Sequence, residues 1–310
     1  MENIERKTIV EVRGLSKQYG NFYALKDLDL SIKEGEIVGL VGKNGAGKTT
    51  LIRLIAGLIE PTSGTMSLFG ENDKSKLTRM RGGIAAMVET PALYLNMNAH
   101  DNLMTRCILE NMPKAGLEQY IKDRLEYVGL GDYYKSSKKV KDFSLGMRQR
   151  IGIAMALTGD PKLLILDEPT NGLDPEGIKQ IRELLQKINK EQGATIIVSS
   201  HILSELGKFA TSYVFLDQGE KIKEATEQEL ESNGGKIIKI TAKDNKKACK
   251  ALTDLKYEHV EKDDTIIISN VNNVAEAINK MAKAGIEFVS FKEESSDLEQ
   301  FFVDLLEELQ

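Results

Sequence analysis

Short apolar runs bounded by glycine or charged residues are the clearest pattern along this chain. Three of them, residues 37–41, 163–166 and 195–199, are rich in leucine or β-branched side chains. Runs of this kind are typical of fully buried parallel strands. Helical patterns follow two of them, at residues 48–58 and 177–191. This alternation of strands and helices predicts an α/β core with a parallel sheet.

A helical insertion interrupts the predicted core. Between about residues 98 and 141 the strand pattern disappears, and helical patterning replaces it, for example over residues 117–130. We interpret this stretch as an all-helical subdomain inserted into the α/β core.

A second domain is expected after residues 231–235, a polar stretch with two glycines that predicts a flexible connector. The elements expected beyond it are strand 236–242, helix 245–255, strands 257–261 and 265–269, helix 272–284 and strand 287–292. This βαββαβ order is that of a small ferredoxin-like α+β domain. An acid-rich helix is expected at residues 297–309. The predicted domains are therefore 7–230 and 236–310.

Length, charge and cysteine content limit the classes of protein to which this chain can belong. A chain of 310 residues has room for one large and one smaller domain. Its net charge of −5 argues against a nucleic-acid partner. We find neither a transmembrane run nor, in residues 1–13, the apolar core of a signal peptide. Cys107 and Cys249 lack metal-ligand spacing and are expected to be reduced thiols. We therefore expect a cytoplasmic protein, for which any membrane process requires a partner.

A glycine-rich segment directly follows the strand at residues 37–41 and precedes a helix. Its two glycines bracket four residues before Lys-Thr, which is the P-loop pattern. Backbone N–H groups of such a loop, together with the helix start, bind phosphate oxygens. A chance match is improbable in this strand-to-helix context. The residues expected to bind ATP here are Gly42, Asn44, Gly45, Ala46, Gly47, Lys48, Thr49 and Thr50.

Two carboxylates, Asp167 and Glu168, end the strand at residues 163–166. The carboxyl edge of an open α/β sheet is where its ligands bind. We expect Asp167, with the Thr49 hydroxyl, to hold Mg²⁺. Glu168 is then placed to orient or deprotonate the attacking water. Without the P-loop, simple capping of a turn would be the better interpretation of the pair.

Three further motifs appear in a fixed order, at residues 143–150, 171–175 and 199–201. Together with the P-loop and the Asp-Glu strand, they resemble the nucleotide-binding subunits of ABC transporters over about residues 7–230. The resemblance implies a P-loop NTPase of the ABC type. It also implies that Ser144 and Gly146 bind the γ-phosphate of ATP held by another subunit. The active form would then be a two-fold dimer of this chain with a second copy or a close relative.

The resemblance also assigns roles to single residues. Asp174 would relay between the two ATP sites, and His201 would contact the γ-phosphate and help to hold the attacking water. Tyr19 looks like the aromatic residue that stacks on adenine, with Phe22 and Tyr23 as alternatives. The other two histidines, His100 and His259, lack such a setting and are expected to be exposed.

Three residues depart from the common family pattern. Leu145 and Met147 replace a glycine and a glutamine in the signature motif. Glu89 stands where the family normally has a glutamine that touches Mg²⁺ and the membrane subunit. An acid at this position, followed by Thr-Pro, is similar to the ATPases of bacitracin-resistance and lantibiotic-immunity exporters. Glu89 is thus a candidate Mg²⁺ ligand.

These observations predict an ATP-hydrolysing subunit, peripheral at the inner face of the cell membrane, that powers an exporter of peptide antibiotics or other amphiphilic compounds. A separate transmembrane permease would be its partner. The alternative is a soluble ABC-type ATPase that acts on nucleic acid or ribosomes. Relatives of that kind tend to carry two cassettes or long coiled-coil insertions, and this chain shows neither.

Overall fold

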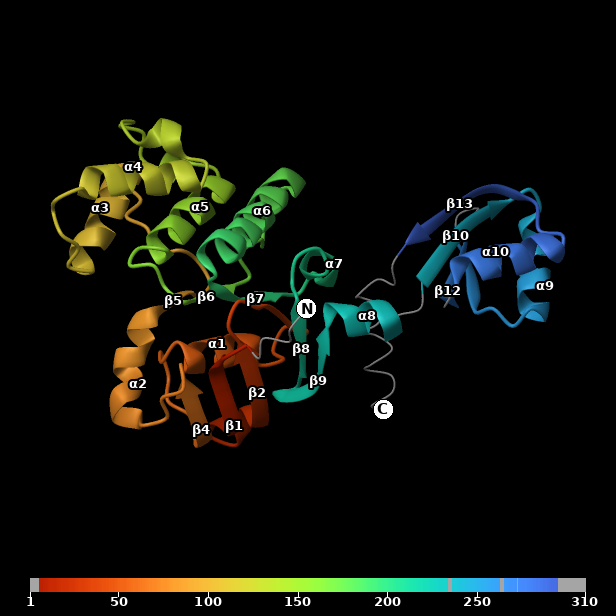
Figure 1. Ribbon diagram of the computed structural model, residues 1–310, viewed down its shortest axis with the longest axis horizontal. Helices are drawn as coiled ribbons and strands as arrows, with labels where there is room; N and C mark the ends of the chain where they lie inside the picture. Colours follow the sequence, from red (N-terminus) through yellow and green to blue (C-terminus); the bar gives the residue numbers. More distant parts are fainter. Residues whose placement is uncertain (1–5, 234–235, 263–264, 272, 295–310) are drawn as a thin grey trace. The chain divides into compact units, whose positions relative to one another are not determined.

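The computed structural model describes residues 6–233, 236–262, 265–271 and 273–294 (Figure 1). The chain divides into two compact units. The first comprises Met1–His201 and Lys208–Glu224, and the second comprises Ile202–Gly207 and Ala225–Gln310. A flexible connector was expected at residues 231–235. Residues 231–233 instead form the end of α8 (Glu227–Asn233).

A six-stranded sheet with the order β5-β6-β7-β3-β8-β9 forms the centre of the first unit. The contacts β5–β6, β6–β7, β7–β3 and β3–β8 are parallel, as the sequence predicts. The three predicted strands are present, and two of them run one residue further. The strands are β3 (Ile37–Val41), β5 (Ile84–Met87), β6 (Leu163–Asp167), β7 (Thr195–Ser200), β8 (Ser212–Asp217) and β9 (Glu220–Thr226).

A three-stranded antiparallel sheet, which was not predicted from the sequence, also belongs to the first unit. Its order is β2-β1-β4, with β1 (Thr8–Tyr19), β2 (Phe22–Lys33) and β4 (Ser63–Leu68). The pairing of β1 with β2 shifts register four times. Each shift moves side chains between the two faces, so a simple alternation of apolar and polar residues is lost.

Helix α1 (Lys48–Ile55) joins the two sheets through one hydrophobic core. Leu51 and Ile55 of the helix belong to the same buried cluster as Leu15 of the antiparallel sheet and Ile165 of the parallel sheet. The helix ends three residues before the predicted limit. The phosphate loop therefore leads from a central buried strand into a helix that is fixed by packing.

The predicted helical insertion is present as α3 (Ala99–Leu109), α4 (Leu117–Tyr127) and α5 (Leu145–Ala156), which group together in Figure 1. No strand lies between β5 and β6, two elements whose connection is fully described. Helix α6 (Pro175–Gln192) contacts α5. The other short elements of this unit are α2 (Lys74–Met80) and the 3-10 helices Arg81–Gly83, Gly131–Tyr133 and Val140–Asp142.

The second unit has its own sheet and its own core. Its four-stranded antiparallel sheet has the order β11-β12-β10-β13, and its elements follow one another as βαββαβ. This is the split βαβ arrangement of ferredoxin-like units. Buried residues of both helices, among them Leu252 and Met281, pack on Ile240 and Ile266. The expected helix at residues 297–309 lies outside the described residues.

The elements of this second unit are α7 (Leu203–Leu206), α8, β10 (Lys236–Ala242), α9 (Asn245–Asp254), β11 (His259–Lys262), β12 (Thr265–Val271), α10 (Val274–Lys283) and β13 (Phe288–Glu294). Within the described part of the chain, no helix combines the length and the apolar character needed to cross a bilayer.

Candidate functional site

The phosphate loop has a backbone that only glycine permits at two positions. Gly47, which precedes α1, has a φ of 107°, and a Cβ there would lie 2.8 Å from the carbonyl oxygen of Ala24. A Cβ on Gly42 would lie 2.5 Å from the carbonyl oxygen of Leu216. The chain therefore bends tightly against its neighbours here, and this leaves the start of α1 open toward the loop.

Lys48 supplies a fixed positive charge beside this loop. Its side chain is 6% exposed, and its Nζ donates to the carbonyl oxygen of Gly42 at 2.6 Å. The same nitrogen lies 3.6 Å from Glu168 Oε1. A buried ammonium group held by loop carbonyls is oriented before a phosphate arrives.

The carboxylate of Asp167 lies at the end of β6, as predicted, and is held on both sides. Its Oδ2 accepts a hydrogen bond from Thr49 Oγ1 at 2.8 Å, and its Oδ1 accepts one from Ser199 Oγ at 2.6 Å. Asp167 is 2% exposed. Thr49 and Asp167, the two residues expected to bind Mg²⁺, are thus brought together in the structure.

Glu168 and His201, the two candidate catalytic residues, are also adjacent. The Nδ1 of His201 lies 2.7 Å from Glu168 Oε2, and the backbone N–H of His201 donates to the same oxygen at 3.4 Å. Glu168 has a φ of 50°, in the left-handed region that non-glycine residues seldom adopt. Its side chain is 21% exposed, so water can reach the carboxylate.

A cavity of about 270 Å³ lies beside the P-loop. It is lined by residues 43–50 of the P-loop segment, by Glu168, and by Phe22 and Ala24. Tyr19 is 51% exposed and is absent from this lining, whereas Phe22, one of the two alternatives, is part of it. Tyr19 and Phe22 are both exposed aromatic residues at the turn between β1 and β2, so Tyr19 stays the predicted adenine neighbour, with Phe22 as an alternative.

Ser144 and Asp174 each cap a helix within this chain. Ser144 Oγ accepts from the Met147 N–H at 3.2 Å at the start of α5, and Asp174 Oδ1 accepts from the Gly177 N–H at 3.0 Å at the start of α6. A Cβ on Gly146 would lie 3.9 Å from the Cα of Gly177, so the two helix starts are close neighbours. Neither residue lines the P-loop cavity. The helix start at Ser144 was expected, whereas the cap formed by Asp174 was not.

Glu89 is paired with a basic residue of α1. Its side chain is 66% exposed and forms an ion pair of 2.5 Å with Arg53 of α1. The described residues contain no cluster of three or more histidine, cysteine, aspartate or glutamate side chains suited to a metal. The role of Glu89 as a Mg²⁺ ligand therefore stays a prediction.

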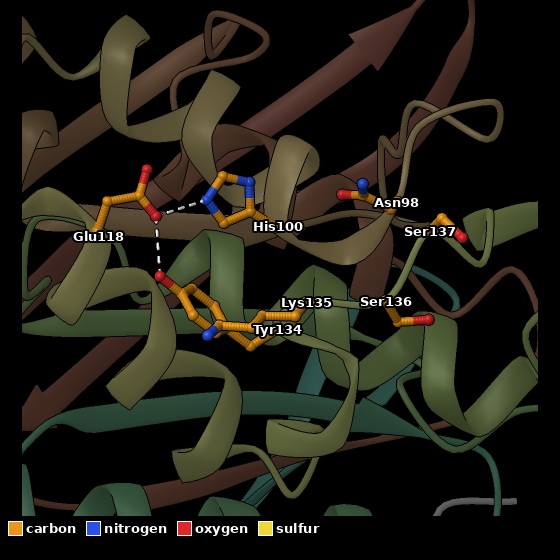
Figure 2. Close-up of a pocket in the computed structure, with 7 residues that line it drawn as sticks. All are labelled: Asn98, His100, Glu118, Tyr134, Lys135, Ser136 and Ser137. Carbon is orange, nitrogen blue, oxygen red and sulfur yellow. Dashed lines mark hydrogen bonds and ion pairs between the residues drawn. The ribbon is translucent and has the colours of Figure 1, made fainter.

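The two remaining histidines were expected to be exposed, but both are partly buried and hydrogen-bonded. His259 Nδ1 lies 2.9 Å from the carbonyl oxygen of Tyr257. His100 lies between Asp101 Oδ1 at 3.1 Å and Glu118 Oε2 at 2.9 Å. Figure 2 shows His100 and the hydroxyl of Tyr134 meeting at the Glu118 carboxylate. They line a cavity of about 370 Å³ that shares no residue with the P-loop cavity.

This arrangement predicts a pH-dependent contribution of His100 to stability. Burial lowers its pKa, but the hydrogen bonds to Asp101 and Glu118 together outweigh burial and raise the pKa above 6.5. The folded state therefore holds the proton more tightly than the unfolded state. The stabilisation is fully present below the unfolded pKa and is lost as the pH rises through the folded pKa.

Urea unfolding of the wild type and of His100→Gln at several pH values measures this contribution. We expect the free energy lost by the substitution to be larger near pH 6 than near pH 9. An equal loss at both pH values would show that the His100 contacts do not depend on its charge.

The residues around the P-loop cavity suit a nucleoside triphosphate and a metal ion. The open helix start and the Lys48 ammonium complement phosphate charge. The Thr49 hydroxyl and the Asp167 carboxylate are oxygen ligands of the type that Mg²⁺ prefers. Glu168 also lines the cavity and adds a partly exposed carboxylate beside these groups.

Comparisons with known proteins agree with this geometry. Residues 25–171 match the family model described as ABC transporter. The chain is 37% identical over 303 residues to the bacitracin transport ATP-binding protein BcrA of Enterococcus faecalis, covering 96% of each chain. It is 41% identical over 216 residues to the lantibiotic transport ATP-binding protein SrtF of Streptococcus pyogenes, covering 70% of this chain and 90% of that one.

A solved structure shows the same fold. It is the dimeric post-hydrolysis state of the ATP-binding cassette MJ0796 bound to ADP and Pi, with a TM-score of 0.62 and 28% identity. The match covers 71% of this chain and 99% of that one. The chain therefore belongs to the ATP-binding proteins of ABC transporters and is an ATPase of that family.

Proposed function

We propose that this ATPase powers the export of a peptide antibiotic through a separate membrane-spanning permease. The observation that carries the proposal is the similarity to the bacitracin transport protein, which extends over 96% of both chains and thus includes both compact units. The similarity to a lantibiotic transport protein supports the same class of cargo. Association with the permease would place the protein at the inner face of the membrane.

The proposed active form contains two ATP-binding subunits and two bound ATP molecules. The sequence has one P-loop, so each subunit would bind one ATP. Ser144 and Gly146 of one subunit would complete the site formed by the P-loop of the other. The position of Ser144 at the start of α5 supports this role, since a helix start with a serine hydroxyl binds anions well. Asp174, at the start of α6, would then lie between the two sites.

Hydrolysis would begin with the triphosphate on the P-loop, where Lys48 and the backbone N–H groups hold the phosphate oxygens. Glu168 would accept a proton from the water that attacks the γ-phosphorus, and the bond to the ADP oxygen would break. His201, in contact with Glu168, would hold this carboxylate and the water in place. Mg²⁺, held by Thr49 and Asp167, would neutralise phosphate charge when bound.

The alternative, an ATPase that acts on nucleic acid or ribosomes, has less support. The net charge of −5 does not favour a polyanionic partner. The two relatives described above are named as transport proteins, and each matches most of this chain.

Bacitracin susceptibility of the source organism tests the proposed cargo class. Deletion of the gene is expected to lower the minimal inhibitory concentration of bacitracin or of a lantibiotic several-fold. The wild-type gene should restore it, and a gene carrying Glu168→Gln should not. Unchanged susceptibility to both classes after deletion would contradict export of peptide antibiotics without affecting the assignment as an ATPase.

A further inference from the structure

Ser199 lies beside the two catalytic-site carboxylates because of the strand register. β6 and β7 are parallel neighbours, and Asp167 pairs with Ser199 across them. Ser199 is fully buried. It is two residues before His201, so the same strand end carries both side chains toward Glu168.

One hydroxyl group makes two bonds there. Ser199 Oγ donates to Asp167 Oδ1 at 2.6 Å and accepts from the backbone N–H of Glu168 at 2.9 Å. Because Ser199 binds Asp167 Oδ1, the other carboxylate oxygen, Oδ2, faces Thr49. The two bonds together fix the plane of the carboxylate. The bond from Glu168 holds the backbone of a residue with a φ of 50°, a conformation that needs support from its surroundings.

We infer that Ser199 is a positioning residue for ATP hydrolysis, which orients Asp167 toward Thr49 and holds Glu168 in its left-handed conformation. The inference rests on the roles proposed above for Asp167 and Glu168. Ser199 would act by setting the direction of two carboxylates. Hydrogen-bonded partners behind the ligands of a site typically contribute about 10–100-fold to affinity or activity.

A purely structural role is the competing explanation, and the same strand supplies a control for it. Thr195, at the other end of β7, is equally buried, and its Oγ1 accepts from the Gly35 N–H at 2.9 Å. Thr195→Ala and Ser199→Ala both remove a buried hydroxyl that accepts a backbone N–H. Only the second substitution affects the catalytic-site carboxylates.

The test compares Ser199→Ala, Ser199→Thr, Thr195→Ala and Glu168→Gln in the full chain. The measurements are kcat and KM for ATP, binding of a non-hydrolysable ATP analogue with Mg²⁺ and with EDTA, and the urea midpoint. Ser199→Ala is expected to lower kcat about 10–100-fold. It should weaken binding in Mg²⁺ more than binding in EDTA, and Ser199→Thr should restore most of kcat. Thr195→Ala should lower the urea midpoint and keep kcat close to the wild-type value.

The inference fails if Ser199→Ala keeps the wild-type kcat, or if both alanine variants lose kcat equally. It also fails if threonine restores nothing. Glu168→Gln separates this result from the proposed mechanism. If Glu168→Gln is inactive and Ser199→Ala is fully active, the positioning role alone is wrong; if Glu168→Gln is active, the assignment of the base is wrong.

Discussion

Replacement of Glu168 by glutamine should reduce ATP turnover by a factor of about 10²–10⁴. The amide keeps the shape of the side chain but cannot take a proton from water. Lys48, Thr49 and Asp167 stay unchanged, so ATP should still bind. The measurements are phosphate release at saturating ATP and equilibrium binding of ATP by the same preparation.

A glutamate of α6 provides the control for this change. Glu183 is exposed and pairs with Lys179 on the helix surface, so Glu183→Gln should leave turnover unchanged. Normal turnover by Glu168→Gln would show that another group accepts the proton.

Mixing two inactive variants should restore ATP hydrolysis if the sites are shared between subunits. Lys48→Ala disables the P-loop and keeps Ser144, whereas Ser144→Ala does the reverse. In a mixed dimer, the P-loop of the second variant meets Ser144 of the first, so one complete site forms. An equal mixture should regain up to roughly a quarter of the wild-type rate, since half of the dimers are mixed and each has one active site of two.

The loss of the α5 cap needs its own control, because removal of an N-cap costs about 1 kcal/mol of stability. Asp73 caps α2 through the Ser75 N–H, and Asp73→Ala should lose stability without loss of turnover. If the mixture of the two inactive variants stays inactive, the site is completed within a single subunit or Ser144 has no part in it.

The elements around the phosphate loop could be predicted because their signals are contiguous. The strand at residues 37–41, the glycines and the following helix occupy one short segment, and the structure has them in place. The antiparallel sheet could not be predicted in this way. Its strands come from separate segments, and its register shifts remove the alternation that would identify the faces.

The same limit applies within the site. The sequence alone could not give the directions of Tyr19 and Phe22, two residues that pair across the turn between β1 and β2, because side-chain direction depends on that irregular register. Ser199 had no role before the structure, since a serine alone carries no chemical signal. Its importance depends on the pairing of β6 with β7, elements that are distant along the chain. The available indications were its place at the end of a buried strand and its membership of the motif at residues 199–201.

The two hydrophobic cores share no residue, and this has an evolutionary consequence. A unit that buries its own apolar side chains can be gained or lost as a separate module without opening the core of the other. The lantibiotic transport relative fits this view, because an alignment of only 216 residues accounts for 90% of its length. The ATPase machinery and the ferredoxin-like appendage can therefore diverge under different selective pressures.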